Sequence, residues 1–361
     1  MSPAFRAFLV ACSLLLLHLH GIVGMDPGTE AVGVFDQGRH GVSLTTVREA
    51  RRCSSARNKE DKLPPKPLLV AAPREAGEYP VLVFLHGYMA LNSFYSQLLQ
   101  HVASHGFVVV GPQLYTVSGP DTTDEINAAA AVIDWLAVGL SSVLPPDVHP
   151  NLSKVSVAGH SRGGKVAFAL ALGHATNKLS LPLAALVAVD PVDGMGVGKQ
   201  TPPPILTGRA RSLRVGAPVM VVGTGLGELP NGPLLPPCAP LGVSHAAFFD
   251  ECAGSAPSAC HLVARDYGHL DMMDDDTPGT RGALTRAVCR SGGARAPMRR
   301  FVGGATVAFL RKWVRGDGAA LEGIRARPET APVVLSLDEF VDEYDADLCK
   351  PQEMNVADRQ G

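Results

Sequence analysis

Short apolar runs alternate with amphipathic segments over most of this 361-residue chain, and this alternation restricts the possible fold more than any other feature. The continuous apolar run at residues 79–85 suits a strand that is buried on both faces of a sheet. Residues 93–105 follow with apolar side chains at helical spacing, and the pattern stops at Gly106. Further strands are predicted at residues 107–110, 155–158, 183–189 and 218–222, and further helices at residues 122–140, 165–172 and 299–315. This order predicts an α/β fold with a mainly parallel sheet and helices on both faces, in one domain over residues 35–345.

The charge balance narrows the function classes. Lys and Arg number 32 against 34 Asp and Glu, which leaves a formal net charge of −2. A nucleic-acid-binding protein needs an excess of cations, so this class is excluded. The hydrophobic share of 46% argues against a chain that is disordered throughout.

Both ends of the chain differ from the predicted domain. Arg6 precedes an apolar run at residues 7–17, which is too short to span about 30 Å of hydrocarbon as a helix. The pattern predicts a cleavable targeting segment at residues 1–24, and it favours a secretory signal that ends near Gly24. A plastid transit peptide and a short membrane anchor are the alternatives. Residues 346–361 are predicted to form a polar C-terminal tail.

Six cysteines remain after Cys12 is removed with the targeting segment, which permits three disulfides in an oxidising compartment. Cys252 and Cys260 flank a loop of small residues and are predicted to form a local bridge. Six unpaired thiols are the alternative, because a large domain does not depend on disulfides. Asn151 begins a glycosylation sequon, which matters only for a chain that enters the secretory pathway.

The segment Gly159-His160-Ser161-Arg162-Gly163 matches G-x-S-x-G between a predicted strand and a predicted helix. This context indicates a nucleophile elbow, a strained turn that exposes the serine hydroxyl. Ser161 is therefore the predicted nucleophile. The backbone N–H of Arg162, at the start of the following helix, is a predicted oxyanion donor.

A serine hydroxyl is a weak nucleophile, so a histidine must accept its proton and an acid must orient that histidine. The expected chain order is serine, acid, histidine. His269 lies in the loop-like stretch Asp266-Tyr267-Gly268-His269-Leu270-Asp271 and is the predicted base. His245 and His261 are expected to be structural or surface residues.

Two strand ends offer the acid. Asp190 directly follows the predicted strand at residues 183–189, so its carboxylate is expected near Ser161. Glu228 follows the later strand after a glycine-rich loop and stays open as the alternative. Asp193, three residues after Asp190, is typical of a turn with Gly194.

The loop His86-Gly87-Tyr88-Met89 follows an earlier strand and is expected to give the second oxyanion donor. The N–H of Tyr88 is the first choice, and that of Met89 is the alternative. Apolar residues near the predicted site are expected to line a substrate pocket, although core packing is the alternative for at least half of them. They are Met89, Phe94, Phe248, Phe249 and Met272. The sequence has no C-x-x-C pair, no H-E-x-x-H and no glycine-rich phosphate loop, so neither a metal nor a cofactor is expected.

Four stretches resemble the plant chlorophyllases, which are serine esterases of the α/β-hydrolase fold. They are Gly159-His160-Ser161-Arg162-Gly163-Gly164, Val189-Asp190-Pro191-Val192-Asp193-Gly194, the stretch from Asp266 to Asp275, and Phe248-Phe249-Asp250-Glu251-Cys252 with Cys260-His261. The resemblance implies hydrolysis of the phytyl ester of chlorophyll to chlorophyllide and phytol. It also implies the triad Ser161, Asp190 and His269, which favours Asp190 over Glu228 as the acid. Family members are assigned to plastids, the endoplasmic reticulum or the vacuole.

Two other function classes stay open at this stage. A lipase or cutinase would use the same triad on other acyl esters, because the pocket and not the fold decides the substrate. The non-enzymatic alternative is an inactive hydrolase that carries a pigment or lipid. The expected partners are chlorophyll or a related phytyl-porphyrin and, through apolar loops, the surface of a membrane.

Overall fold

The computed structural model describes residues 33–49 and 63–342, which build one sheet of nine strands. The predicted targeting segment at residues 1–24 and the predicted tail at residues 346–361 lie outside the described residues. In sheet order the strands are β1 (Val42–Val47), β2 (Leu68–Pro73), β4 (Val108–Pro112), β3 (Gly77–Leu85), β5 (Val148–His160), β6 (Leu183–Val189), β7 (Val219–Thr224), β8 (Ser258–Ala264) and β9 (Leu335–Asp342).

The centre of the sheet is parallel. All neighbouring pairs from β4 to β8 run parallel, whereas β1 with β2, β2 with β4 and β8 with β9 are antiparallel. Parallel neighbours require long crossover connections. Helices lie in the connections from β3 to β4, from β5 to β6 and from β7 to β8, whereas residues 190–218 connect β6 to β7 without a helix. The carboxyl ends of the central strands therefore meet at one edge, where open α/β sheets bind their ligands.

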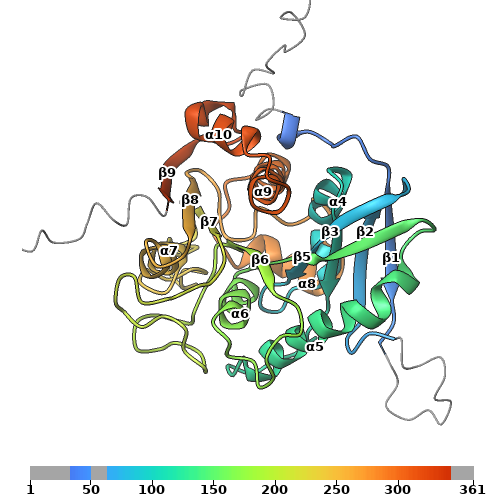
Figure 1. The fold of residues 1–361 in the computed structure, drawn as a ribbon. Helices are drawn as coiled ribbons and strands as arrows, with labels where there is room; N and C mark the ends of the chain where they lie inside the picture. Colours follow the sequence, from blue (N-terminus) through green and yellow to red (C-terminus); the bar gives the residue numbers. More distant parts are fainter. Residues whose placement is uncertain (1–32, 50–62, 343–361) are drawn as a thin grey trace, which may run out of the picture.

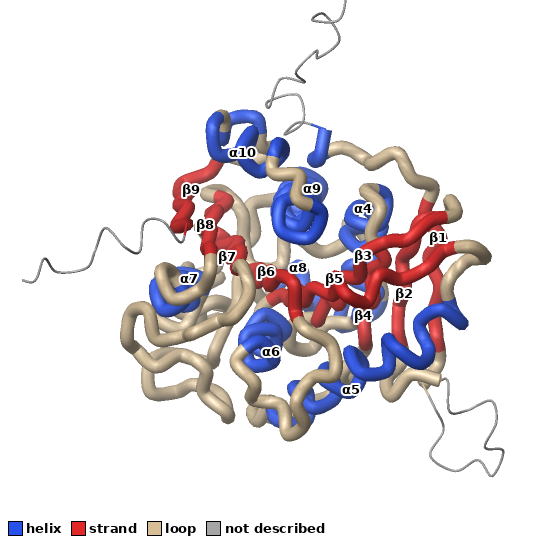
Figure 2. The backbone as a smooth tube through the Cα atoms, in the orientation of Figure 1, coloured by secondary structure: helices blue, strands red, loops and turns tan. Residues whose placement is uncertain are grey.

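Helices cover both faces of the sheet (Figure 1, Figure 2). One face carries α5 (Thr123–Gly139), α6 (Arg162–Ala171) and α7 (His245–Cys252). The other carries α4 (Ser96–Ser104), α9 (Arg295–Leu310) and α10 (Ala319–Ala326). The remaining helix α8 (Gly279–Ala287) lies beside the candidate site, and the short helical turns are η1 (Asn92–Tyr95), η2 (Leu140–Val143), η3 (Arg311–Arg315) and η4 (Pro328–Thr330).

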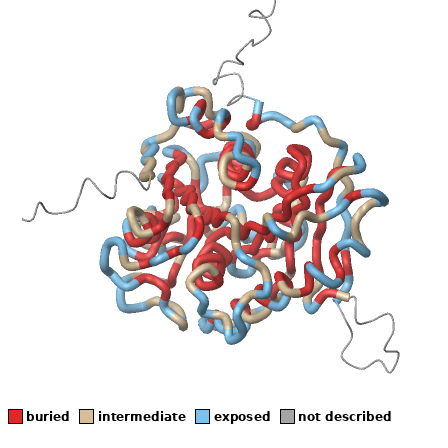
Figure 3. The backbone as a smooth tube through the Cα atoms, in the orientation of Figure 1, coloured by how far each residue is buried: buried red, intermediate tan, exposed pale blue. Residues whose placement is uncertain are grey.

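The central strand β3 shows why the sheet needs both helical layers. Val81, Val83 and Leu85 pack into the core under α5, α6 and α7, while Leu82 and Phe84 pack into the core under α4 and α9. Successive side chains of a strand point to opposite faces, so a strand that is apolar throughout must be covered on both. Figure 3 shows the resulting buried band through the middle of the molecule. The predicted α/β fold with a mainly parallel sheet is confirmed.

Some elements differ from the sequence prediction. The strand at residues 183–189 has its predicted bounds as β6, but the helix predicted at residues 93–105 divides into η1 and α4. The strands β1, β2, β8 and β9 were not predicted. The outer strands β1 and β9 carry polar, partly exposed side chains, as edge strands that resist pairing with other chains often do.

The prediction of a disulfide between Cys252 and Cys260 is wrong, because both thiols are free and buried. Cys252 ends α7 and belongs to the core on one face of the sheet, whereas Cys260 in β8 points into the core on the opposite face. The sheet itself therefore separates the two sulfur atoms. Burial raises the pKa of the Cys252 thiol to about 12 and also raises that of Cys260.

Candidate active site

The turn between β5 and α6 holds Ser161 in a strained conformation, with φ 56° and ψ −122°. A non-glycine residue at positive φ is uncommon and often marks a functional position. The flanking glycines permit the turn. A Cβ at residue 159 would lie 2.1 Å from the carbonyl oxygen of Gly163, and one at residue 163 would lie 2.2 Å from that of Leu85. The strand-turn-helix context predicted for G-x-S-x-G is present.

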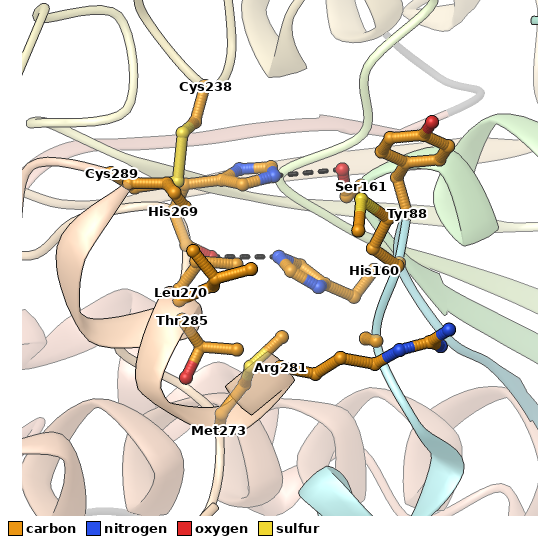
Figure 4. A pocket seen from close by; sticks show the side chains of 15 residues that line it. Tyr88, His160, Ser161, Cys238, His269, Leu270, Met273, Arg281, Thr285 and Cys289 are labelled. Carbon is orange, nitrogen blue, oxygen red and sulfur yellow. Dashed lines mark hydrogen bonds between the residues drawn. A yellow bond between two sulfur atoms is a disulfide. The ribbon is translucent and has the colours of Figure 1, made fainter. Parts of the chain in front are cut away.

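The structure brings together the three side chains that the sequence singled out. The Oγ of Ser161 lies 2.8 Å from Nε2 of His269, as Figure 4 shows. The Nδ1 of the same histidine lies 2.7 Å from Oδ2 of Asp190. Because Nδ1 of His269 donates to the Asp190 carboxylate, Nε2 is the atom that faces the serine hydroxyl as an acceptor. This arrangement can transfer the Ser161 proton and stabilise the imidazolium that forms.

Asp190 is fully buried directly after β6, where the predicted strand ends. Burial alone would raise the pKa of its carboxyl, but the hydrogen bond and charge of His269 together with the Thr224 hydroxyl lower that pKa. Thr224 Oγ1 donates to Oδ2 at 2.6 Å. Gly227 completes the enclosure, since a Cβ there would lie 2.8 Å from Oδ2. Asp190 is thus held as a carboxylate facing His269.

A cavity of about 200 Å³ opens beside Ser161 and His269. Its lining is mainly apolar, with Ala90, Leu270 and Met273 among the contributing side chains. The polar helix α8 contributes one face, from Arg281, Leu284 and Thr285, and its C-cap residue Val288 continues that face. The Nη1 atom of Arg281 is buried without a hydrogen-bond partner within the described part of the chain. An apolar cavity with a nucleophile and a lone donor suits a largely apolar ester.

Comparison with known proteins decides the family. The family model for chlorophyllase matches residues 30–342. This chain belongs to the chlorophyllase family. It is 51% identical to chlorophyllase-2 of Arabidopsis thaliana over 294 residues. The aligned residues cover 81% of this chain and 92% of the relative. Chlorophyllase-1 of Arabidopsis thaliana is 44% identical over 274 residues, covering 75% and 83%. The protein named chlorophyllase-1, chloroplastic, of Citrus unshiu is 39% identical over 317 residues, covering 87% and 90%. As a chlorophyllase-family member with this sheet, the chain has the α/β-hydrolase fold and is a carboxylic ester hydrolase.

The other acids and histidines considered for this chlorophyllase-family site lie elsewhere. Glu228 accepts a hydrogen bond from Ser244, 2.5 Å away. Asp193 forms a buried ion pair with Nζ of Lys165 at 2.9 Å, so it anchors α6 rather than His269.

His245 and His261 hydrogen-bond to each other at 2.8 Å in the core, with their rings tilted by 52°. Burial lowers the pKa of His261 to about 3. Both histidines therefore have structural surroundings, as the sequence predicted.

Four of the five residues predicted to line the substrate pocket do not line it. Met89 does, but Phe94 and Met272 are buried in the core under α4 and α9, and Phe248 and Phe249 in the core under α7. Their sequence positions next to the motifs misled the prediction, because neighbouring residues of a helix or turn point to different sides. Some of the lining residues that the prediction missed recur at positions 281, 284 and 285 of α8 and at its C-cap, residue 288, a helical spacing that marks one face.

A disulfide joins Cys238 to Cys289, and both cysteines line the cavity beside His269 (Figure 4). It ties the second residue after α8 to the loop after β7. The sequence permitted this pair among 15 possible pairings but gave no reason to choose it.

The acidic residues around His269 fix the loop that carries it. Asp271 accepts hydrogen bonds from the N–H groups of Gly268 and Gly292, each at 2.7 Å. Asp274 accepts from the backbone N–H of Gln97 at 2.9 Å, in the first turn of α4. Asp275 pairs with Arg299 of α9 at 2.5 Å. The repeated aspartates of this motif thus connect the loop to three separate elements.

The predicted oxyanion loop lies directly against the elbow. A Cβ at Gly87 would lie 3.0 Å from Nδ1 of His160 and 3.2 Å from Cβ of Ser161, which is closer than most Cβ contacts, so glycine favours this approach. The N–H of Gly87 donates to the hydroxyl of Tyr95, which leaves the next residues, Tyr88 and Met89, as donor candidates. The Arg162 side chain turns away into a bidentate pair with Glu125 at 2.6 and 2.7 Å, while its backbone begins α6.

The described residues contain no group of three His, Cys, Asp or Glu side chains placed to hold a metal ion. The expectation that neither metal nor cofactor takes part stays a prediction.

Proposed function

We propose that this chain hydrolyses the phytyl ester of chlorophyll to chlorophyllide and phytol, with Ser161 as nucleophile, His269 as base and Asp190 as the residue that orients the base. The observation that carries the proposal is the 2.8 Å contact between Ser161 Oγ and His269 Nε2 at the floor of an apolar cavity. Family membership supplies the substrate class.

In the first half of the reaction, Ser161 Oγ attacks the carbonyl carbon of the propionate ester while its proton moves to His269 Nε2. Asp190 accepts the hydrogen bond from Nδ1 and stabilises the imidazolium. The tetrahedral intermediate collapses, the bond to the phytyl oxygen breaks, and that oxygen takes the proton from His269. Phytol leaves, and the chlorophyllide acyl group stays on Ser161.

In the second half, a water molecule gives a proton to His269 and its oxygen attacks the acyl carbon. Collapse of this intermediate returns the proton to Ser161 Oγ and releases chlorophyllide as its carboxylic acid, which loses the remaining proton to solvent. The same two donors serve both intermediates in this proposal, namely the N–H groups of Tyr88 and Arg162. The position of Arg162 at the first residue of α6 supports its role, because the start of a helix favours negative charge.

The size of the cavity supports a binding mode in which only part of the substrate lies inside the cavity. About 200 Å³ is small for a ligand pocket, so the ester end enters while the macrocycle stays at the mouth. Tyr88, Met89 and Leu284 line or flank this cavity and are 52%, 44% and 46% exposed. These apolar side chains would contact the macrocycle or the membrane surface that delivers it.

The compartment is part of the same proposal. The Cys238–Cys289 bond supports an oxidising compartment, since disulfides are rare where thiols are kept reduced. This agrees with entry into the secretory pathway and residence in the endoplasmic reticulum or vacuole of a plant cell. A chloroplast is the alternative, and the names of two relatives, from Citrus unshiu and Citrus sinensis, contain the word chloroplastic. A shift in size after endoglycosidase treatment, lost in Asn151→Gln, would support the secretory route.

The substrate assignment is tested by comparing rates on a phytyl-porphyrin ester and on p-nitrophenyl esters of short acids. The proposal predicts a higher kcat/KM for the pigment. A protein that cleaves only the p-nitrophenyl esters would instead be a general carboxylesterase of the lipase or cutinase type.

A further inference from the structure

His160, the residue directly before the nucleophile, has a partner on each ring nitrogen. It is fully buried at the end of β5, and its ring centroid lies 4.7 Å from that of His269. Its Nε2 lies 2.8 Å from the backbone carbonyl oxygen of His269, as Figure 4 shows, and its Nδ1 lies 2.8 Å from the hydroxyl of Tyr95. The side chain thus connects two segments that are distant in sequence.

The partners fix where the protons are. A carbonyl oxygen only accepts, so Nε2 of His160 carries the hydrogen and Nδ1 is the acceptor. Tyr95 therefore donates its O–H to Nδ1. The Tyr95 oxygen in turn accepts the N–H of Gly87 at 3.1 Å. The three bonds run in one direction, from Gly87 through Tyr95 and His160 to His269.

We propose that His160 is a positioning residue, which holds the backbone of His269 and, through Tyr95, the oxyanion loop at Gly87 in fixed register with Ser161. The inference rests on the proposed function, because it assigns the two segments their roles as base and oxyanion donor. Gly87 is the residue before Tyr88, so the bond from its N–H to Tyr95 anchors the loop immediately before the proposed oxyanion donor. His269 is fixed on one side by Asp190 and on the backbone side by His160.

Burial agrees with a neutral ring. Desolvation, reinforced by the nearby His269, lowers the pKa of His160 to about 3. A neutral ring is required here, since a second cation 4.7 Å away would oppose the imidazolium that forms on His269. The short distance that makes His160 useful as a support therefore also demands that it stay uncharged.

Three variants separate the two halves of the connection. In His160→Gln the terminal amide reaches the position of Nε2, so the bond to the His269 carbonyl survives and the bond from Tyr95 is lost. In His160→Asn the amide oxygen replaces Nδ1, so the Tyr95 bond survives and the His269 bond is lost. Tyr95→Phe removes the Tyr95 bond from the other side.

The readouts are kcat and KM on p-nitrophenyl butyrate, with the melting temperature of each variant as a measure of folding. We expect each variant to lose about 10- to 100-fold in kcat with KM nearly unchanged, since a displacement of about 1 Å costs up to about 100-fold. The double variant Tyr95→Phe with His160→Gln should be no slower than the slower single variant, because both changes break the same bond. Independent, multiplying losses in that double variant would overturn the proposal, as would unchanged kcat in His160→Asn.

A second measurement on the unaltered protein covers the case in which variants do not fold. The ¹⁵N chemical shifts of His160 should report a neutral ring with hydrogen on Nε2 from pH 5 to pH 8. The opposite tautomer or a charged ring would contradict the inference. Because these tests use a short ester, loss of the chlorophyll assignment would not affect them.

Discussion

Cys238 and Cys289 are bonded to each other across 51 residues, and both line the cavity into which Ser161 opens. The bond encloses the segment that contains α7, β8, His269 and α8. One covalent link thus closes the loop that supplies the candidate base and one wall of the cavity.

Replacing both cysteines by alanine should lower the free energy of unfolding by about 4 kcal/mol, the loop-entropy value for a closed loop of this length. The wall formed by α8 should also loosen, which raises KM for a long ester more than it changes kcat. Urea unfolding and steady-state kinetics check both effects. Equal stability of the double alanine variant and the parent would show that the loop is held by other contacts.

Asp190→Asn should reduce kcat by about 10³- to 10⁴-fold, because an amide can donate to Nδ1 and favours the wrong tautomer of His269. The melting temperature should change little, because the amide fills the same space as the carboxylate. Glu228→Gln is the matched control and should retain full activity, as its carboxylate bonds to Ser244 instead. Reversal of these two results would make Glu228 the acid.

Stability should fall as the pH falls from about 6.5 towards 4. Burial lowers the pKa of His86 and His105 to about 4, and that of His160 and His261 to about 3, against 6.5 in the unfolded chain. The unfolded state therefore binds more protons in this range, and each such histidine costs up to about 1.4 kcal/mol per pH unit. Above about pH 6.5 these histidines are mostly neutral in both the folded and the unfolded state, so this loss of stability is absent.

Urea unfolding at pH 7.5, 6.5 and 5.5 measures this slope. His105 lies away from the cavity, so His105→Gln should leave activity intact. It should reduce the dependence of the free energy of unfolding on pH by the contribution of about one bound proton. A free energy of unfolding that does not change between pH 6.5 and 5.5 would show that these rings are not buried neutral.

Glu251 should be important for folding but not for chemistry. Its buried carboxylate accepts hydrogen bonds from the N–H groups of Thr207 and Gly208 and from the hydroxyl of Ser212, at 2.7 to 2.8 Å. Glu251→Gln should lower the free energy of unfolding by about 2 kcal/mol, since bonds to a charged group are worth about that much. Its exposed neighbour Asp250, changed to Asn, is the matched control. A melting temperature equal to that of the control would contradict this role.

The sequence predicted the centre of this molecule better than its borders. Strands such as β6 are apolar throughout, so their positions follow from composition alone, and the elbow at Ser161 follows from a local turn that needs two glycines. The edge strands β1 and β9 are mixed in polarity and depend on their partners in the sheet. The helix α8 has two glycines and few apolar residues, so its pattern is too weak to read locally.

The candidate site was likewise predicted where local motifs specify it and missed where long-range contacts do. The serine and the histidine could be chosen from local motifs, whereas the choice of Asp190 over Glu228 needed the resemblance to a family. The pairing of Cys238 with Cys289 and the burial of Phe94 and Phe248 depend on which layer of the fold each segment joins. That information lies in long-range contacts, which a motif does not contain.

The most direct test of the account is phytol release from chlorophyll by the purified protein, measured beside Ser161→Ala at equal folded concentration. We expect release by the parent and a loss of about 10³-fold or more in the variant, with a chlorophyllide acyl group trapped on Ser161 of the parent after acid quenching. Equal phytol release by Ser161→Ala would contradict the central claim that this serine is the nucleophile.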